Sequence, residues 1–564
     1  MRRGFAVAVA VLMGAGSPAA DRPEGRPFAT RSVVFARHGM VAAAHPLAVQ
    51  IGVDVLKKGG SAVDAAIAVN AALGLMEPMS CGIGGDLFAI VWDAKTAHLY
   101  GLNASGRAPG ALTADKVPAD PDGTMPSSTP HTWTVPGTVD GWYELHGKFG
   151  RLPMADLLAP SIVAAREGVP APQVIAAMWD GGERLHRAQP GFAPIYLPGG
   201  HAPGEGVPFR NPALADAYDA IARGGRDAFY KGSIARDIVA FSKANGGFFS
   251  DEDFARHRSD WVDPVSTDYR GVQVFELPPN TQGIAALQML NILEGFDLKA
   301  LGRDSPQFWH TMVEAKKLAY EDRARYIADP AFAKVPVEGL LAKDYARARA
   351  RLIDPDRAAA RYEAGQPALN RGDTTYLAVA DGDGNMVSLI QSNYTGFGSG
   401  YVVEAWGFGI QDRGALFDLA PGLPNSLQPG KRPFHTIIPA FAMKDGKPWL
   451  AFGLMGGDMQ AQGHAQVIVN IVDFGMNLQE AGDAARFYHA ESSEPTGTVM
   501  TRGGVLHLES GVPGEVRREL VKRGHRVADA VGLYGGYEAV ARDPVTGVLS
   551  GATESRKDGC AMGY

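Results

Sequence analysis

The chain has 564 residues, of which 46% are hydrophobic and 20% are charged, the composition of a globular protein that buries a large core. Its 54 basic and 61 acidic residues give a net charge of −7, which excludes the basic footprint of a nucleic-acid-binding protein. Two cysteines, Cys81 and Cys560, are too few for a disulfide framework or a zinc site. The sequence leaves open whether these two thiols pair with each other.

The first 20 residues have the pattern of a signal peptide. Arg2 and Arg3 precede an apolar stretch at residues 5–13, and residues 17–20 are small enough for cleavage. That stretch is too short to cross a bilayer, and no later run reaches about 18 apolar residues. We therefore expect a periplasmic or secreted protein without a membrane span. The alternative is an apolar N-terminus with no targeting function.

Helix and strand signals follow one another along the chain. His45-Pro46 begins a helix that ends at Gly59-Gly60, and Ser61 is an N-cap for a second helix that is almost wholly apolar. A long helix begins after Ser305 and carries an apolar stripe. Residues 330–373 are polar and loop-rich, which is typical of a segment exposed to cleavage. The expected elements are helices at 46–58, 62–75, 156–167, 212–223, 306–326 and 461–472, and strands at 87–92 and 98–102.

A threonine pair lies where the chain becomes strand-rich. Residues 372–376 read Gly-Asp-Thr-Thr-Tyr and precede an apolar strand, a turn at 381–385 and a returning strand. A threonine at a strand start is ordinarily no more than a good β-former. If the bond between Asp373 and Thr374 is cut, Thr374 gains a free amine that can act as the general base for its own hydroxyl. Thr374 is therefore a candidate nucleophile.

Further motifs accompany this segment on both sides. They are Gly39-Met40-Val41-Ala42, Gly59-Gly60-Ser61-Ala62-Val63-Asp64, Asp322-Arg323, Gly396-Phe397-Gly398-Ser399-Gly400, Pro424-Asn425, Lys431-Arg432-Pro433, Gly456-Gly457 and Asp473-Phe474-Gly475-Met476-Asn477. As a set they resemble the γ-glutamyltranspeptidases over residues 36–564, and in particular the divergent branch that includes glutathione hydrolase-like proteins and an oxamate amidohydrolase.

The resemblance implies a fold and a maturation step. The fold is α+β, the N-terminal-nucleophile hydrolase αββα sandwich of four layers. Members of the family are made as one chain that cleaves itself. Cleavage between Asp373 and Thr374 would give a large subunit of residues 21–373 and a small subunit of residues 374–564, which share one core.

The resemblance also implies a reaction. Thr374 attacks the carbonyl of a small-molecule amide, and water or an amino-acid or peptide acceptor then takes the acyl group. Gly456 and Gly457 match the oxyanion hole, where backbone N–H groups approach the substrate closely, although a glycine pair alone indicates only a turn. Ser392 falls where the family has a hydroxyl that supports the nucleophile; the alternative is a solvent-facing strand serine. No metal or cofactor is expected, since no phosphate loop or HExxH motif is present.

The expected substrate pocket departs from the family pattern. Ser105 stands at the position of the family's carboxylate-binding arginine, and Arg107 lies two residues on, on the same face of a strand. His435-Thr436 replaces a serine pair, and Tyr394, next to Asn393, replaces an asparagine. Leu416 replaces the aspartate that pairs with the substrate α-amine, and leucine cannot neutralise an ammonium. The expected pocket residues are Arg107, Asn393, Tyr394, His435 and Thr436.

Three functions are consistent with this pattern. The first is a self-processing amidohydrolase or acyltransferase that cleaves γ-glutamyl or related carboxylate-bearing amides. The second is an amidase for another acid amide, either oxamate-like or like the substrates of cephalosporin acylases. The third is an inactive exported binding protein on the same fold, which the presence of Thr374, Gly456 and Gly457 disfavours.

Overall fold

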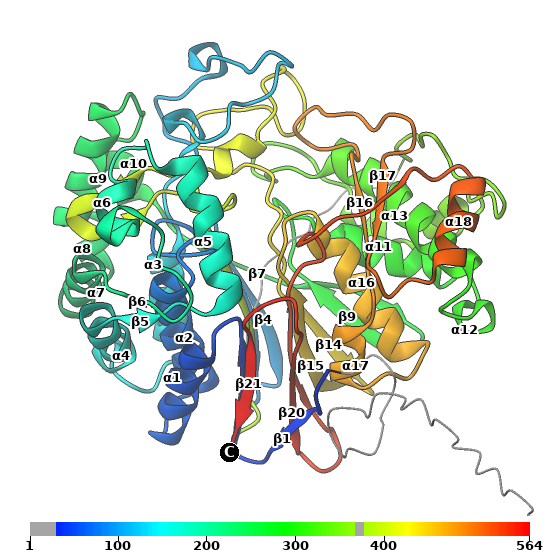
Figure 1. The fold of residues 1–564 in the computed structure, drawn as a ribbon, viewed down its shortest axis with the longest axis horizontal. Coiled ribbons are helices and arrows are strands. Elements are labelled where there is room, and N and C mark those ends of the chain that lie inside the picture. Colours follow the sequence, from blue (N-terminus) through cyan, green and yellow to red (C-terminus); the bar gives the residue numbers. More distant parts are fainter. Residues whose placement is uncertain (1–29, 367–376) are drawn as a thin grey trace, which may run out of the picture.

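The computed structural model describes residues 30–366 and 377–564. The expected signal peptide at residues 1–20 and the expected cleavage site at Asp373 and Thr374 lie outside the described residues. Figure 1 shows two central sheets with helical layers on either side. The expectation of four layers, helix–sheet–sheet–helix, is met.

Each central sheet has seven antiparallel strands. Sheet A has the order β1-β20-β19-β15-β14-β9-β8 and sheet B the order β21-β2-β10-β11-β3-β4-β7. The strands of sheet A are Val34–Ala36, Leu549–Thr553, Tyr537–Arg542, Lys447–Leu454, Ala440–Lys444, Val272–Glu276 and Val265–Tyr269. The strands of sheet B are Cys560–Gly563, Gly39–Ala43, Leu377–Asp381, Met386–Ser392, Asp86–Asp93, His98–Ala104 and Asp260–Val262.

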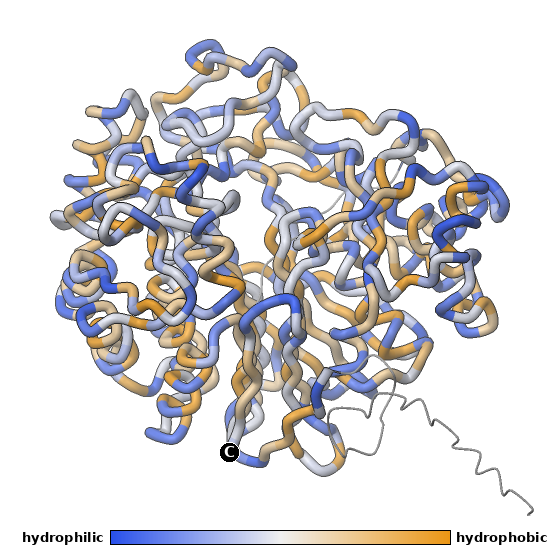
Figure 2. The backbone as a smooth tube through the Cα atoms, viewed as in Figure 1, coloured by the Kyte–Doolittle hydropathy of each residue, from blue (hydrophilic) through white to orange (hydrophobic). Residues whose placement is uncertain are grey.

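Alternating side chains divide the apolar core between the two faces of sheet B. Met40 and Ala42 belong to the core between the sheets, whereas Val41 and Ala43 point to the core beneath the helices of the other face. This is the two-residue periodicity of a strand buried on both faces. Figure 2 shows hydrophobic residues along these central strands.

The outer face of sheet B is covered by helices α1 and α2, with further helices outside them (Figure 1). The predicted helices at 46–58 and 62–75 are confirmed, and Ser61 forms a capping box with Asp64. The predicted hairpin is β3 and β4. The helices on this side are α1 Pro46–Lys57, α2 Ala62–Met76, α3 Thr138–Phe149, α4 Met154–Glu167, α5 Gln173–His186, α6 Phe192–Tyr196, α7 Pro212–Gly224, α8 Arg226–Tyr230, α9 Ser233–Ala244 and α10 Asp251–Arg256.

The outer face of sheet A is covered by α11, α16 and α17, and α13 packs against α11. The predicted helix at 306–326 is confirmed as α13, with Ser305 as its N-cap. Residues 330–366 are less irregular than expected, because two short helices, α14 and α15, lie in them. The helices on this side are α11 Gly283–Leu293, α12 Leu298–Leu301, α13 Pro306–Tyr326, α14 Val337–Leu341, α15 Lys343–Ala350, α16 Met459–Val472, α17 Leu478–Asp483 and α18 Gly514–Lys522.

In the described part, Cys81 and Cys560 are free thiols, and no helix is long and apolar enough to cross a membrane.

Short strands and 3-10 turns lie between the longer elements. The short strands are β5 Val169–Pro170, β6 Pro208–Phe209, β12 Val402–Val403, β13 Phe408–Gly409, β16 Phe487–Ala490, β17 Val505–Leu508 and β18 Val527–Ala528, and the 3-10 turns are Ala114–Lys116, Pro130–Thr132, Pro198–Gly200, Glu404–Trp406 and Arg413–Leu416.

Candidate active site

A cavity of about 260 Å³ lies at one end of the central strands. Its wall combines the start of β10, the end of β11, the C-terminal part of α2 and the loops that precede α16. The residues that line it are Ala44, Asn70, Leu73, Glu77, Met79, Ser80, Cys81, Met178, Leu377, Ile390, Gln391, Ser392, Tyr394, Gly396, Arg413, Thr436, Ile437, Met455, Gly456, Gly457, Gln460 and Lys557.

The strand that follows the candidate nucleophile in the sequence begins in the cavity wall. Leu377, the first residue of β10, lines the cavity and follows Thr374 by three positions in the sequence. Thr374 and Asp373 themselves lie outside the described residues, so their roles stay predictions.

Gly456 and Gly457 form the part of the wall that precedes α16. Both have positive φ angles, +118° and +57°, and L-residues rarely adopt the first of these. The carbonyls of the two residues accept the N–H groups of Met459 and Gln460, whereas their own N–H groups donate to no group within the described residues. Two amide donors are therefore left for a ligand, as an oxyanion hole requires.

A buried network, which the sequence did not reveal, holds this glycine pair. The Gln282 amide donates to the Gly457 carbonyl over 3.0 Å and also to the carbonyl of Thr436, so it ties together two walls of the cavity. Arg323 of α13 donates to the Gln282 side chain and, over 2.7 Å, to Asp458. Since Arg323 is fully buried, these contacts fix the loop that carries Gly456 and Gly457.

Arg413 is the cationic centre of the cavity wall. Its guanidinium donates to Ser392 Oγ over 2.7 Å and to Thr436 Oγ1 over 2.9 Å, and it lies 4.7 Å from the ring centroid of Tyr394. Arg413 and Thr436 are buried, and all four residues line the cavity. Sequence reasoning missed Arg413, although it stands three residues before the substituted Leu416.

The hydrogen bonds to Arg413 orient both hydroxyl groups. An arginine can only donate, so Ser392 Oγ and Thr436 Oγ1 act as acceptors toward it. Ser392 Oγ also accepts a hydrogen bond from the Tyr394 N–H over 2.9 Å. Together with the bond from Arg413, this bond occupies both lone pairs of the Ser392 oxygen. The hydroxyl proton of Ser392 is therefore available to donate to another group. Arg413, Ser392 and Thr436 together offer an anion a set of convergent donors.

Three predicted pocket residues do not line the cavity. His435 is fully buried and contacts Asp86, with 3.1 Å between His435 Nε2 and Asp86 Oδ2. Burial lowers the pKa of His435 well below its usual value and raises the pKa of Asp86 to about 7. Arg107 forms an ion pair with Asp260 at 3.3 Å. Asn393 is buried, and its backbone N–H donates to Ser80. The structure thus gathers Ser392, Tyr394, Thr436, Gly456 and Gly457, and places the other three outside the cavity wall.

Leu416 is packed rather than exposed to the cavity. It is buried in an apolar cluster with Ile284, Leu340 and Phe434, against which Tyr394 also packs. Glu77 is the only acidic residue among the described residues that line the cavity. Burial raises the pKa of Glu77, which accepts a hydrogen bond from Ser80 and lies at the end of α2. No carboxylate therefore stands where the family pattern has the partner of an α-amine.

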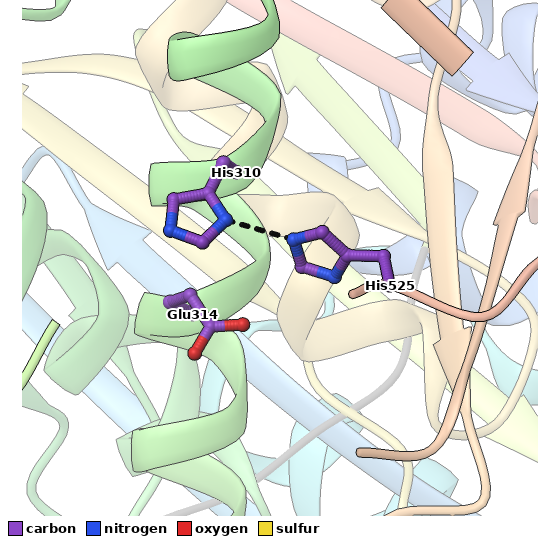
Figure 3. Close-up of side chains that lie close together, drawn as sticks. All are labelled: His310, Glu314 and His525. Atoms are coloured by element: carbon purple, nitrogen blue, oxygen red, sulfur yellow. Dashed lines mark hydrogen bonds between the residues drawn. The ribbon is translucent and has the colours of Figure 1, made fainter. Parts of the chain in front are cut away.

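One cluster elsewhere contains residues of types that bind metals. His310 and Glu314 of α13 and His525, in the loop before β18, lie together in the interior (Figure 3). Their facing atoms are already occupied: His310 Nδ1 and His525 Nε2 are 2.8 Å apart in a mutual hydrogen bond, and Lys317 donates to Glu314 over 2.7 Å. The other His310 nitrogen donates to the carbonyl of Asp354. We therefore assign this cluster a structural role.

This histidine pair predicts a pH dependence of stability. Burial lowers the pKa of His310 and lowers that of His525 to about 2. The unfolded chain binds protons below about pH 6.5 whereas the folded state does not, so stability is complete above that pH and declines as the pH falls. We expect the Tm of the wild type to fall more between about pH 7.5 and pH 5 than that of His525→Asn. His201→Asn, at an exposed position, is the matched control. Equal falls in all three proteins would contradict this role.

Comparison with known proteins agrees with the geometry. Residues 48–564 match the family model described as gamma-glutamyltranspeptidase. The chain is 37% identical over 532 residues to the glutathione hydrolase-like YwrD proenzyme of Bacillus subtilis, with 93% of this chain and 98% of the relative covered. It is also 37% identical over 532 residues to the acylase ACY 1 proenzyme of Pseudomonas sp. strain SE83, with 92% of each covered.

A solved structure extends the comparison to the fold. The crystal structure of cephalosporin acylase from Bacillus halodurans superposes with a TM-score of 0.88 at 42% identity, and the match covers 97% of this chain and 99% of that one. The expected fold, an N-terminal-nucleophile hydrolase of α+β class, is confirmed, and the protein is an enzyme. The chain belongs to the γ-glutamyltranspeptidase family.

Proposed function

We propose that this chain is the precursor of a self-processing threonine amidohydrolase, which cleaves γ-glutamyl or related carboxylate-bearing amides through an acyl-Thr374 intermediate. The observation that carries the proposal is the position of Arg413, Ser392 and Thr436 in one cavity wall with Gly456 and Gly457. The names of the relatives, which are proenzymes of hydrolases and acylases, support it. The precursor would be exported and cut between Asp373 and Thr374 into two subunits.

The proposed reaction has two steps. In the first, the Thr374 hydroxyl attacks the substrate carbonyl while its own amine accepts the proton, and the N–H groups of Gly456 and Gly457 stabilise the oxyanion. The C–N bond then breaks, and the amine leaves with that proton. In the second step, water attacks the acyl ester, which releases the acid and restores the threonine hydroxyl. An acceptor amine in place of water gives a transfer product.

The cavity favours acyl groups that carry a carboxylate but no α-amine. Arg413, with the hydroxyls of Ser392 and Thr436, supplies donors for the carboxylate. Leu416 is packed in an apolar cluster, and a substrate ammonium would find no acidic partner beside it. Leaving a buried ammonium unpaired costs several kcal/mol, on the order of 2–5. A glutaryl-like acyl group thus fits this cavity better than a γ-glutamyl group.

This preference can be measured with two matched substrates. We expect the mature enzyme to hydrolyse glutaryl-p-nitroanilide with a kcat/KM at least about tenfold higher than that for γ-glutamyl-p-nitroanilide. An equal or higher kcat/KM for the γ-glutamyl substrate in the wild type would contradict the assignment.

A further inference from the structure

The cavity has a second cationic side chain that the proposed reaction does not use. Lys557, in the loop between β20 and β21, lines it together with Met178 of α5. Its stem lies against Gly536, where an added Cβ would be 2.5 Å from Lys557 Cγ, and the Gly536 carbonyl accepts the N–H of Met455. Lys557 is thus positioned beside the loop that leads into Gly456 and Gly457.

The Lys557 ammonium has no carboxylate partner within residues 30–366 and 377–564. Its hydrogen bond is to the thioether of Met178, 3.4 Å away, and a thioether is a weak acceptor. The adjacent Asp558 instead accepts the N–H groups of Val174 and Ile175 at the start of α5. Glu77 lines the same cavity, and burial favours its uncharged form. Lys557 therefore presents to the cavity a positive charge that forms no ion pair with a described carboxylate, although Glu77 interacts with it electrostatically.

Lys557 and Arg413 belong to different parts of the cavity wall. Arg413 contacts Ser392, Thr436 and Tyr394. Lys557 instead contacts Met178 and lies against Gly536, beside the loop that leads into Gly456 and Gly457. If the acyl carboxylate lies at Arg413 and the scissile carbonyl at Gly456 and Gly457, the leaving amine is on the Lys557 side of this glycine pair.

We propose that Lys557 determines specificity by binding an acidic group on the amine portion of the substrate. The proposal rests on the proposed function for the orientation of the amide. The substrate class is then an amide with a carboxylate on each side: an acid-bearing acyl group joined to an amino acid or another amino-carboxylate. A charge-assisted hydrogen bond at a half-buried position is the interaction that would select it.

The test compares two anilides that differ only in the leaving group. Glutaryl-4-nitroanilide has an uncharged leaving amine, and glutaryl-3-carboxy-4-nitroanilide has an acidic one. With mature wild-type enzyme we expect KM to be about five- to tenfold lower for the carboxylated substrate. Lys557→Gln should bring the ratio of the two KM values to about one, and Lys557→Glu should invert it. Lys522→Gln, on the exposed surface of α18, should keep the wild-type ratio.

A binding measurement separates failure of this proposal from failure of the proposed function. Binding of 3-carboxy-4-nitroaniline and of 4-nitroaniline to mature wild-type and Lys557→Gln enzymes can be followed by ligand-observed NMR without turnover. A preference for the acidic amine that Lys557→Gln abolishes supports the assignment, even if neither anilide is hydrolysed. A preference that persists in Lys557→Gln, or no preference in the wild type, overturns it.

Discussion

Thr374→Ala is expected to yield a single uncut chain with no measurable amide hydrolysis. The substitution removes the only hydroxyl proposed to attack the substrate and the one proposed to attack the preceding peptide bond. Loss of a nucleophile typically lowers kcat by about 10³-fold or more, so the residual activity should be below detection. The measurement is the hydrolysis of glutaryl-p-nitroanilide by purified wild type and variant at equal concentrations.

Thr374→Ser is the matched control for this variant. Serine keeps the hydroxyl and, once the chain is cut, the free amine beside it, so Thr374→Ser should still process and should hydrolyse the anilide at a reduced rate. Hydrolysis by Thr374→Ala at a rate near that of the wild type would show that another residue is the nucleophile.

Arg413→Met is expected to lower kcat/KM for glutaryl-p-nitroanilide by about 30- to 4,000-fold, chiefly through KM. Removing one partner of a buried, hydrogen-bonded charge pair costs about 2–5 kcal/mol, because the substrate carboxylate is left without its cation. For butyryl-p-nitroanilide, which has no carboxylate, the same substitution should lower kcat/KM much less. The measurement is the ratio of kcat/KM for the two anilides in wild type and variant.

Two controls separate carboxylate binding from a structural role of Arg413. Arg413→Lys keeps a positive charge but not the fork that reaches Ser392 and Thr436, so it should recover only part of the loss. Self-processing and Tm, measured on the same samples, report whether the variants fold. Equal losses for the glutaryl and butyryl substrates in a folded, processed variant would contradict the carboxylate assignment.

Local signals predicted the elements whose ends they mark. Ser61 and Ser305 cap α2 and α13. An N-cap side chain accepts an N–H group only a few residues further along the chain, so the sequence alone reveals it. The apolar stripe of α13 was also predicted. The burial of Lys316 and Arg323 on the same helix was not, because their partners lie on other segments: Lys316 contacts Ser492, and Arg323 contacts Asp458.

The same distinction applies to the candidate site. Motif positions indicated Gly456, Gly457 and Ser392, which do meet in one cavity. The spacing along one strand suggested that Arg107 could replace a missing arginine, but spacing cannot reveal that Asp260 of β7 lies beside it. Arg413 is defined as a site residue by contacts with Ser392 and Thr436, each more than 20 positions away in the chain. Such contacts arise only from the tertiary structure.

The most direct test of a self-processing threonine hydrolase is the denatured intact mass of the purified protein, beside Thr374→Ala. We predict two polypeptides for the wild type, the smaller one with the mass of residues 374–564, and one polypeptide for the variant. A single uncut chain in both samples would contradict the assignment of Thr374 and, with it, the proposed mechanism.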